Sequence, residues 1–331
     1  MTPAFAERDV ERLKAERQAE ILQLRAEPRG LADETFDRVL YAAGSRYAAP
    51  DGGTAESVAR IGAPDLRRFH AERYRPGAVT LVVAGDVSAD AAERLAERVF
   101  GAWQGAAAPP AAPADRPARL ERAVHLVAKG DAAQSELRLV HVGIPRSHPD
   151  YFPVTVMNAI LGGLFSSRIN LNLREKHGYT YGAYSGFEWR RGAGPWSVST
   201  AVQSDVTVAA ATQTLLEIDR TRTEQVGEDE LTLATSYLDG VFPIRFETTT
   251  AIAVALANME IYGLPADYYD TYRARVRAVT TADVLEAARR HVRPEHLQLV
   301  VVGDPAVIRA PLEALGFGPM TVYDAEGRVT T

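Results

Sequence analysis

Two stretches of the chain repeat each other at a constant distance of 218 residues. Asp65, Arg75-Pro76 and Gly85-Asp86 recur as Asp283, Arg293-Pro294 and Gly303-Asp304. A chance likeness between two Val-rich strands would not keep register through a helix, a turn and a strand, so the match indicates an internal duplication. Residues 119–331 fill one repeat unit, and the residues before them are too few for a second. We therefore predict one complete C-terminal repeat preceded by the back half of an N-terminal repeat.

The clearest break in composition is an Ala- and Pro-rich stretch at residues 105–118. Its proline density disfavours regular structure and is typical of an extended linker. We expect residues 1–104 to be the C-terminal half of a first domain, and residues 119–331 to be a complete second domain.

The pattern of apolar residues predicts an α/β (α+β) fold in which helices flank a mixed β-sheet. Before the linker it predicts helices over residues 10–24, 31–41, 64–74 and 89–99, and one strand over residues 79–84. After the linker it predicts strands over 123–128, 137–144, 181–189, 196–202 and 297–302. Helices are expected over 151–164 and 167–176, through most of 206–291, and after the last strand.

Composition excludes several classes of function. The 331 residues carry 37 Lys and Arg against 43 Asp and Glu, a formal charge of −6 that does not suit binding to nucleic acid. The absence of cysteine restricts any metal site to histidine and carboxylate ligands. No export signal or uninterrupted membrane-spanning stretch is evident, so we expect no membrane partner. We expect the cytoplasm by default, or the periplasm if a missing N-terminal segment carries a signal.

The most informative run is SSRINLNLREKHGYTYGAYS, at residues 166–185. Its apolar positions describe a helix whose basic C-terminal end, with Arg174 and Lys176, is favoured by the helix dipole and is ended by Gly178. A capped surface helix would account for this much. It would not account for the seven-residue spacing that places Arg174 near a helix end and Tyr181 at the start of the following strand.

This run resembles the C-terminal domain signature of the insulinase/pitrilysin family, the inverzincin zinc metallopeptidases related to mitochondrial processing peptidase. The resemblance implies two homologous α/β domains that face each other around a chamber. The first domain holds zinc through H-x-x-E-H and a distant Glu, and the second supplies an Arg and a Tyr to the same site. At the matching positions these are Arg174 and Tyr181, whose hydrogen-bond donors would stabilise the oxyanion that develops on a scissile carbonyl.

The zinc motif itself is missing from the sequence. The nearest match, His291-Val-Arg-Pro-Glu-His296, has one residue too many and contains the helix breaker Pro294. By the resemblance, Glu20 falls where the distant third zinc ligand lies, although Leu13 stands where the family often has a further acid, and a solvated helix face would also show such a Glu. We expect zinc in the complete enzyme, with histidines supplied from elsewhere, and no cofactor in the isolated chain.

Three functions remain open at this point. In the first, the chain supplies the Arg/Tyr half of a zinc peptidase site for a peptide substrate, and a subunit or segment bearing H-x-x-E-H completes it in a hetero- or homodimer. The isolated chain would then be inactive. In the second, it is a catalytically silent structural or assembly subunit, like the core subunits of the respiratory cytochrome bc complex. In the third, it is an unrelated α/β binding domain.

Overall fold

The computed structural model describes residues 3–106 and 115–330, so residues 107–114 of the Ala- and Pro-rich stretch lie outside the described part. The chain forms two compact units. Unit 1 comprises Met1–Ile21, Gly52–Ala112 and Val241–Tyr268. Unit 2 comprises Leu22–Asp51, Pro113–Gly240 and Tyr269–Thr331. One break between the units falls within the predicted linker at residues 105–118, but residues 22–51 belong to unit 2 and residues 241–268 belong to unit 1.

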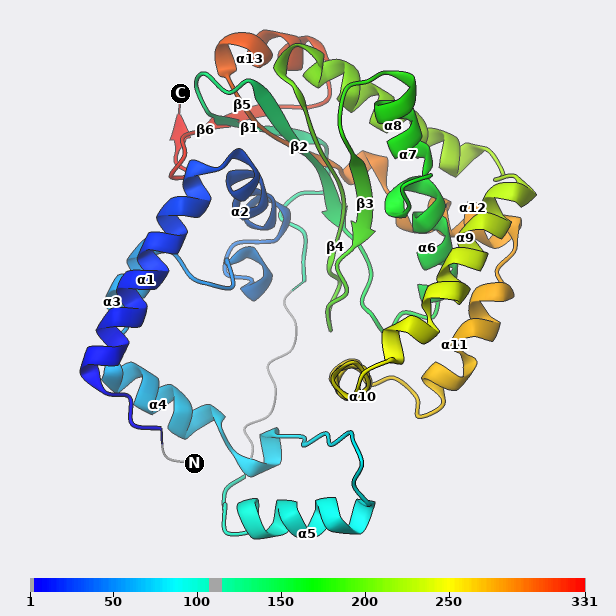
Figure 1. Ribbon diagram of the computed structural model, residues 1–331. Helices are drawn as coiled ribbons and strands as arrows, with labels where there is room; N and C mark the ends of the chain where they lie inside the picture. The colour runs from blue at the N-terminus through cyan, green and yellow to red at the C-terminus, as the bar shows by residue number, and fades with distance from the viewer. Residues whose placement is uncertain (1–2, 107–114, 331) are drawn as a thin grey trace. The chain divides into compact units, whose positions relative to one another are not determined.

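The elements are labelled in Figure 1. The helices of the first third are α1 (Glu7–Ala26), α2 (Pro28–Leu40), α3 (Ala55–Arg60), α4 (Ala63–Arg73) and α5 (Ala89–Phe100). The later helices are α6 (Tyr151–Asn158), α7 (Arg168–Asn170), α8 (Thr207–Thr223), α9 (Glu228–Val241), α10 (Thr249–Tyr262), α11 (Tyr268–Arg277), α12 (Thr281–His291) and α13 (Pro305–Ala314). The strands are β1 (Ala123–Ala128), β2 (Gln134–Val142), β3 (Ala183–Phe187), β4 (Pro195–Gln203), β5 (Gln298–Gly303), β6 (Met320–Tyr323) and β7 (Val329–Thr330).

Unit 2 is built on a seven-stranded mixed sheet with the strand order β3-β4-β2-β5-β1-β6-β7. Strand β1 is parallel to β5 and β6, whereas β2 runs antiparallel to β4 and β5. The mixed sheet flanked by helices confirms the predicted fold class. The strands predicted over 123–128, 196–202 and 297–302 agree with β1, β4 and β5 within about two residues, while β6 and β7 were not predicted.

Helices cover both faces of this sheet, and alternate residues of β2 face different helices. Ser135 accepts a hydrogen bond from Thr207 at the start of α8 (2.8 Å between Oγ1 and Oγ), whereas Arg138 pairs with Asp33 on α2. Leu31 of α2 is buried against the sheet in one cluster with Val127 of β1 and Val302 of β5. The apolar face of α2 therefore explains why residues 22–51 belong to unit 2, since burying it stabilises that unit.

The long helical region that follows β2 is interrupted rather than continuous. Helix α6 continues into a π-helical turn at Ala159–Gly163, and α7 continues into a second one at Leu171–Lys176. The whole run Tyr151–Lys176 is long and apolar enough to cross a membrane by composition, but 61% of its most apolar window is buried inside the structure. This burial is typical of a core helix.

The predicted repeat is visible in the bounds of the helices. Helices α4 and α12 each have 11 residues and begin 218 residues apart, and short 3-10 turns follow both at the same offset. In each copy an aspartate at the third helical position accepts a hydrogen bond from the backbone N–H of the residue before the helix. The distances are 3.0 Å for Asp65 and 2.9 Å for Asp283. At α12 the cap is reciprocal, because Thr280 Oγ1 also accepts from Asp283 N–H (3.2 Å), whereas Gly62 has no side chain to do so. Both arrangements satisfy an otherwise unpaired N–H at the start of the helix.

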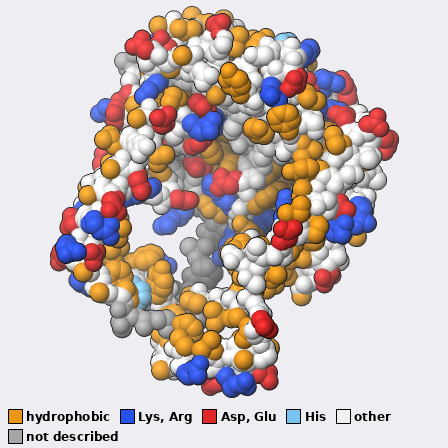
Figure 2. Space-filling view, in the orientation of Figure 1, with side chains coloured by type: hydrophobic (Ala, Val, Ile, Leu, Met, Phe, Trp, Pro, Cys, Tyr) orange, Lys and Arg blue, Asp and Glu red, His pale blue; other side chains and the backbone are white. Residues whose placement is uncertain are grey.

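The strand predicted for residues 79–84 is wrong for this structure. These residues form no strand, and Val79, Leu81 and Val83 leave 51%, 55% and 49% of their surface exposed. In the second copy, the corresponding β5 is hydrogen-bonded to β1 on one side and to β2 on the other. A strand needs partner backbones on its edges, and no described residue pairs with 79–84. Figure 2 shows apolar side chains gathered over α4 and α5 of the same unit.

Candidate functional site

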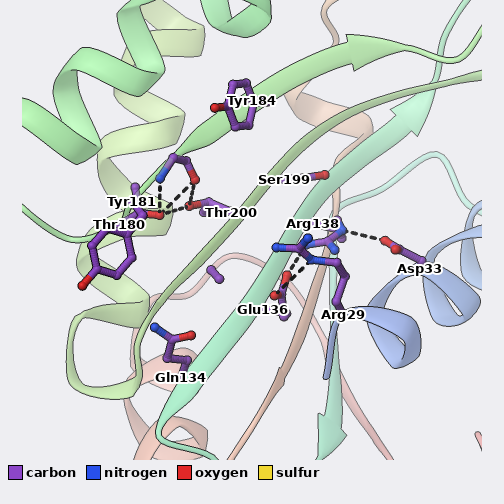
Figure 3. A pocket seen from close by; sticks show the side chains of 12 residues that line it. Arg29, Asp33, Gln134, Glu136, Arg138, Thr180, Tyr181, Tyr184, Ser199 and Thr200 are labelled. Atoms are coloured by element: carbon purple, nitrogen blue, oxygen red, sulfur yellow. Dashed lines mark hydrogen bonds and ion pairs between the residues drawn. The ribbon is translucent and has the colours of Figure 1, made fainter. Parts of the chain in front are cut away.

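A cavity of about 470 Å³ opens over the end of the sheet formed by β2, β3 and β4. Its walls come from these strands, from the turn before β3 and from the start of α2. Figure 3 shows the side chains of Arg29, Asp33, Gln134, Glu136, Arg138, Thr180, Tyr181, Tyr184, Ser199 and Thr200 around it. The lining is polar, with two phenols, several hydroxyls and two charges of each sign.

Tyr181 is held at the rim of this cavity by a tight turn. The Thr180 hydroxyl accepts a hydrogen bond from the Gly182 N–H (3.1 Å) and donates to the Gly182 carbonyl (2.9 Å). Thr200 on β4 also donates to that carbonyl (3.1 Å), which ties the turn to the sheet. Tyr181 is 92% exposed, and its ring extends away from Arg138 and Glu136 (Figure 3). The turn thus presents an exposed phenol beside the cavity, and the catalytic role of Tyr181 stays a prediction.

The floor of the cavity carries a buried ion-pair network. Arg138 is only 4% exposed, and its guanidinium donates to Asp33 (2.9 Å) and Glu136 (2.8 Å). Arg29 lies 3.6 Å from the other oxygen of Glu136 and is largely exposed. A buried guanidinium is tolerated only when its donors are satisfied, and these two carboxylates satisfy it. Sequence reasoning missed these residues, although the charged Glu136 and Arg138 alternate with Leu137 and Leu139 along β2, which marks a polar face.

Arg174 is not among the residues that line the cavity. It lies in the π-helical turn after α7, where its guanidinium stacks 4.5 Å above the Phe165 ring and forms an ion pair with Glu175 (2.9 Å). Gly178 ends this turn in the left-handed conformation (φ +65°), as predicted, and Tyr179 N–H bonds back to the Leu173 carbonyl (2.9 Å). The structure therefore places Tyr181 at the cavity and Arg174 on a neighbouring helix end.

Two asparagines cap the free edge of β3. Ala183 N–H donates to Asn170 Oδ1 (3.0 Å), and Asn158 Nδ2 donates to the Ser185 carbonyl (3.0 Å). Trp196 Nε1 donates to Asn158 Oδ1 as well (3.1 Å). Strand β3 stands at the end of the sheet, where an extended peptide would otherwise pair with it. Because side chains already occupy these two backbone groups, strand addition at this edge does not fit. No sequence signal identifies either asparagine in advance.

The structure does not bring Glu20 together with other potential zinc ligands. Glu20 lies on α1 in unit 1, where its side chain is 60% exposed and pairs with Arg17 (2.9 Å). A catalytic zinc normally has three protein ligands. Among residues 3–106 and 115–330, the three potential ligands that lie close enough to share one ion are His148, Asp150 and His291. Glu20 is not among them, so its role as a zinc ligand stays a prediction.

Comparison with known proteins identifies the family. The family model described as "Peptidase M16 inactive domain" matches residues 60–238, which is more than half of the chain. The chain belongs to the M16 peptidase family. This is the zinc metallopeptidase family to which the run at residues 166–185 pointed, and the expectation drawn from that run is confirmed.

Relatives of this M16 chain include a protein named as a zinc protease and a protein named as a non-peptidase homolog. It is 27% identical over 256 residues to an uncharacterized zinc protease of Streptomyces coelicolor, a match that covers 76% of this chain and 55% of the relative. It is 24% identical over 316 residues to a non-peptidase homolog of Helicobacter pylori, covering 92% of this chain and 69% of the relative. The chain thus spans about half the length of the first of these relatives.

A solved structure shares the fold of the M16 chain over most of its length. The peptidase M16 inactive domain from Pseudomonas fluorescens matches with a TM-score of 0.84 at 27% identity. The match covers 92% of this chain and 72% of the other. The fold and the family are therefore shown, and relatives named as zinc proteases are consistent with zinc in the family.

Proposed function

We propose that this chain is the component of an M16 metallopeptidase assembly that binds the peptide substrate and donates hydrogen bonds to its scissile carbonyl. The single observation that carries the proposal is the exposed phenol of Tyr181, held by a tight turn at the rim of a polar cavity. Zinc and its histidines would come from a partner subunit or another segment. In such an assembly, the metal would activate the attacking water.

The cavity suits a segment of extended polypeptide better than the β3 edge does. Ser199 offers a hydroxyl to a peptide backbone, and Arg29 and Asp33 add one charge of each sign to the lining. Arg138 and Glu136 balance each other's charge below them. A substrate in this cavity would meet donors for its carbonyls along the wall and Tyr181 at the rim. Donors placed where negative charge develops usually make a large contribution to catalysis.

The test is reconstitution with an M16 protein from the same source that carries H-x-x-E-H. The readouts are cleavage of a quenched fluorescent peptide and the metal content of the complex. Tyr181→Phe should lower kcat by about 100-fold, the usual cost of removing one oxyanion donor, with unchanged metal content. Arg174→Ala should also lower it, provided that binding of the partner moves this guanidinium from Phe165. Tyr237→Phe, an exposed tyrosine on α9 outside the cavity, is the matched control.

Two outcomes would contradict the proposal. In the first, Tyr181→Phe and Arg174→Ala both leave the rate of the reconstituted enzyme unchanged. In the second, the isolated chain cleaves the peptide with tightly bound zinc of its own.

A silent assembly subunit is the second candidate function, and one observation favours it. Arg174 is held by Phe165 and Glu175 instead of lining the cavity, so the predicted pair is not preassembled. The Helicobacter pylori relative, which matches most of this chain, is named a non-peptidase homolog. Purification from the native source distinguishes the two functions. A stable assembly without peptidase activity supports the silent subunit, whereas a complex that cleaves peptides supports the first proposal.

A further inference from the structure

Three potential metal ligands converge where the loop before α6 meets the end of α12. His148 and Asp150 come from the loop, and His291 is the last residue of α12. His291 Nε2 lies 2.7 Å from Asp150 Oδ2, and the two imidazole rings are 5.0 Å apart. One donor atom from each residue can be chosen so that all three lie within 4.8 Å of one another. None of the three lines the cavity beside Tyr181.

We infer that His148, Asp150 and His291 bind one divalent transition-metal ion of the zinc, nickel or cobalt type. Imidazole nitrogen favours these ions, whereas calcium takes six to eight oxygen ligands and magnesium prefers an octahedron of oxygens. Two imidazoles and one carboxylate supply three ligands, and water completes the coordination shell. The sequence contains no cysteine, so this is the donor chemistry that the chain has available.

The distances require a small closing movement. Ligand atoms around a tetrahedral zinc lie about 3.3 Å apart, so the most distant pair must approach by at most roughly 1.5 Å, while His291 and Asp150 must separate slightly. Asp150 and His148 are both partly exposed loop residues, which makes this movement accessible. Two hydrogen bonds are exchanged for metal bonds. They are the 2.7 Å contact of His291 with Asp150 and the 3.1 Å bond from Asp150 N–H to His148 Nδ1.

The Arg290 guanidinium would compete with a metal ion for Asp150, but Arg290 also pairs with Glu286. Arg290 Nη1 lies 3.4 Å from Asp150 Oδ2, at the outer limit of a hydrogen bond. The same guanidinium donates to Glu286 at 2.6 Å and is more than half exposed. Arg290 can therefore keep its closer partner while Asp150 turns to an ion. The exchange leaves no unpaired charge buried.

Binding would link two segments that are distant in sequence. Helices α6 and α12 pack against each other in unit 2, and the ion would join the start of one to the end of the other (Figure 1). His291 is almost fully buried and fixes one ligand in place, whereas His148 and Asp150 adapt. We therefore expect an exchangeable site that stabilises unit 2 when the metal is bound. This differs from the expectation drawn from sequence, in which the isolated chain has no cofactor.

Titration of the full chain with metal tests the inference. After treatment with chelator and its removal, Zn²⁺ is titrated by calorimetry, and Co²⁺ is titrated by visible absorption, which reports low coordination number. We expect one equivalent of Zn²⁺ to bind and to raise Tm. His148→Gln and Asp150→Asn should each weaken binding by about tenfold or more and abolish the rise in Tm. Both replace partly exposed side chains, so neither should prevent folding, and circular dichroism checks this.

His296→Gln is the matched control. It removes the other histidine of the near-motif His291–His296 without touching the proposed ligands, so it should bind Zn²⁺ as tightly as the unaltered chain. The inference is overturned if the unaltered chain shows no saturable binding up to about 1 mM Zn²⁺, where the binding free energy is only about −4 kcal/mol. It is also overturned if His148→Gln and Asp150→Asn bind as well as the unaltered chain, or if His296→Gln removes the site.

Discussion

Replacing Gly162 with alanine tests how closely the helical layer packs on the sheet. A Cβ at this position would lie 2.4 Å from Ser185 Oγ and 2.7 Å from the Cβ and backbone N of the same residue. Ser185 lies on β3 and donates to Asn158 Oδ1 (2.8 Å), which also accepts from Trp196 Nε1. Overpacking costs about 1–3 kcal/mol, and each disturbed hydrogen bond costs about 1 kcal/mol. We expect Gly162→Ala to lower the free energy of unfolding of unit 2 by about 2–4 kcal/mol.

Gly240→Ala is the control, because it makes the same change in an exposed helix. A Cβ on Gly240, within α9, would meet nothing within 4 Å. Alanine there should raise stability by about 0.5–1 kcal/mol through backbone entropy.

Urea denaturation followed by tryptophan fluorescence measures both changes. A Trp103→Phe background restricts the signal to Trp189 and Trp196, which lie in unit 2. The packing argument fails if Gly162→Ala is as stable as the parent, or if it gains as much stability as Gly240→Ala does.

Two further predictions concern buried charges. Burial raises the pKa of Asp37 to about 6, outweighing the attraction of Arg190, so the folded state holds its proton more tightly than the unfolded state does. The free energy of unfolding should therefore fall by about 3 kcal/mol as pH rises from about 4 to above 6. Asp37→Asn should remove this fall. If the urea midpoints of the two proteins change with pH in parallel, the prediction is wrong. Arg138→Met leaves Glu136 buried without its closest partner and should cost about 3–5 kcal/mol in urea unfolding, whereas adding Glu136→Leu should recover most of that loss. If the double variant is no more stable than Arg138→Met alone, the buried charge is not the cause.

Features that depend on neighbouring residues were predictable. Helix α4 begins and ends within one residue of the predicted range 64–74, and the 218-residue offset predicted that α12 is its counterpart. Gly178 ends its helix because glycine tolerates the left-handed conformation. The run at residues 166–185 also indicated the family. The helix ends, the glycine turn and the family motif each depend on a short stretch of the chain, and the repeat is read by comparing two such stretches.

Features that depend on distant residues were not predictable in the same way. Residues 79–84 have the composition of β5 but form no strand, because strand formation needs partner backbones and not only β-branched side chains. The ion pair of Arg138 in the cavity floor depends on Asp33, which lies 105 residues earlier in the chain, on α2. The sequence also does not reveal that asparagines cover the β3 edge, since Asn170 and Asn158 reach it from separate helical turns.

The sequence by itself determined most of the helices, the strands β1, β4 and β5, the repeat at 218 residues, the family and the position of Tyr181 after its helix. The tertiary structure alone decided that Tyr181 borders a cavity while Arg174 stacks on Phe165, and that His291 meets Asp150 across 141 residues. The physical reason is the range of the interactions involved. Caps, turns and periodicity act over a few residues, whereas burial, strand pairing and clusters of charge form only when remote segments pack together.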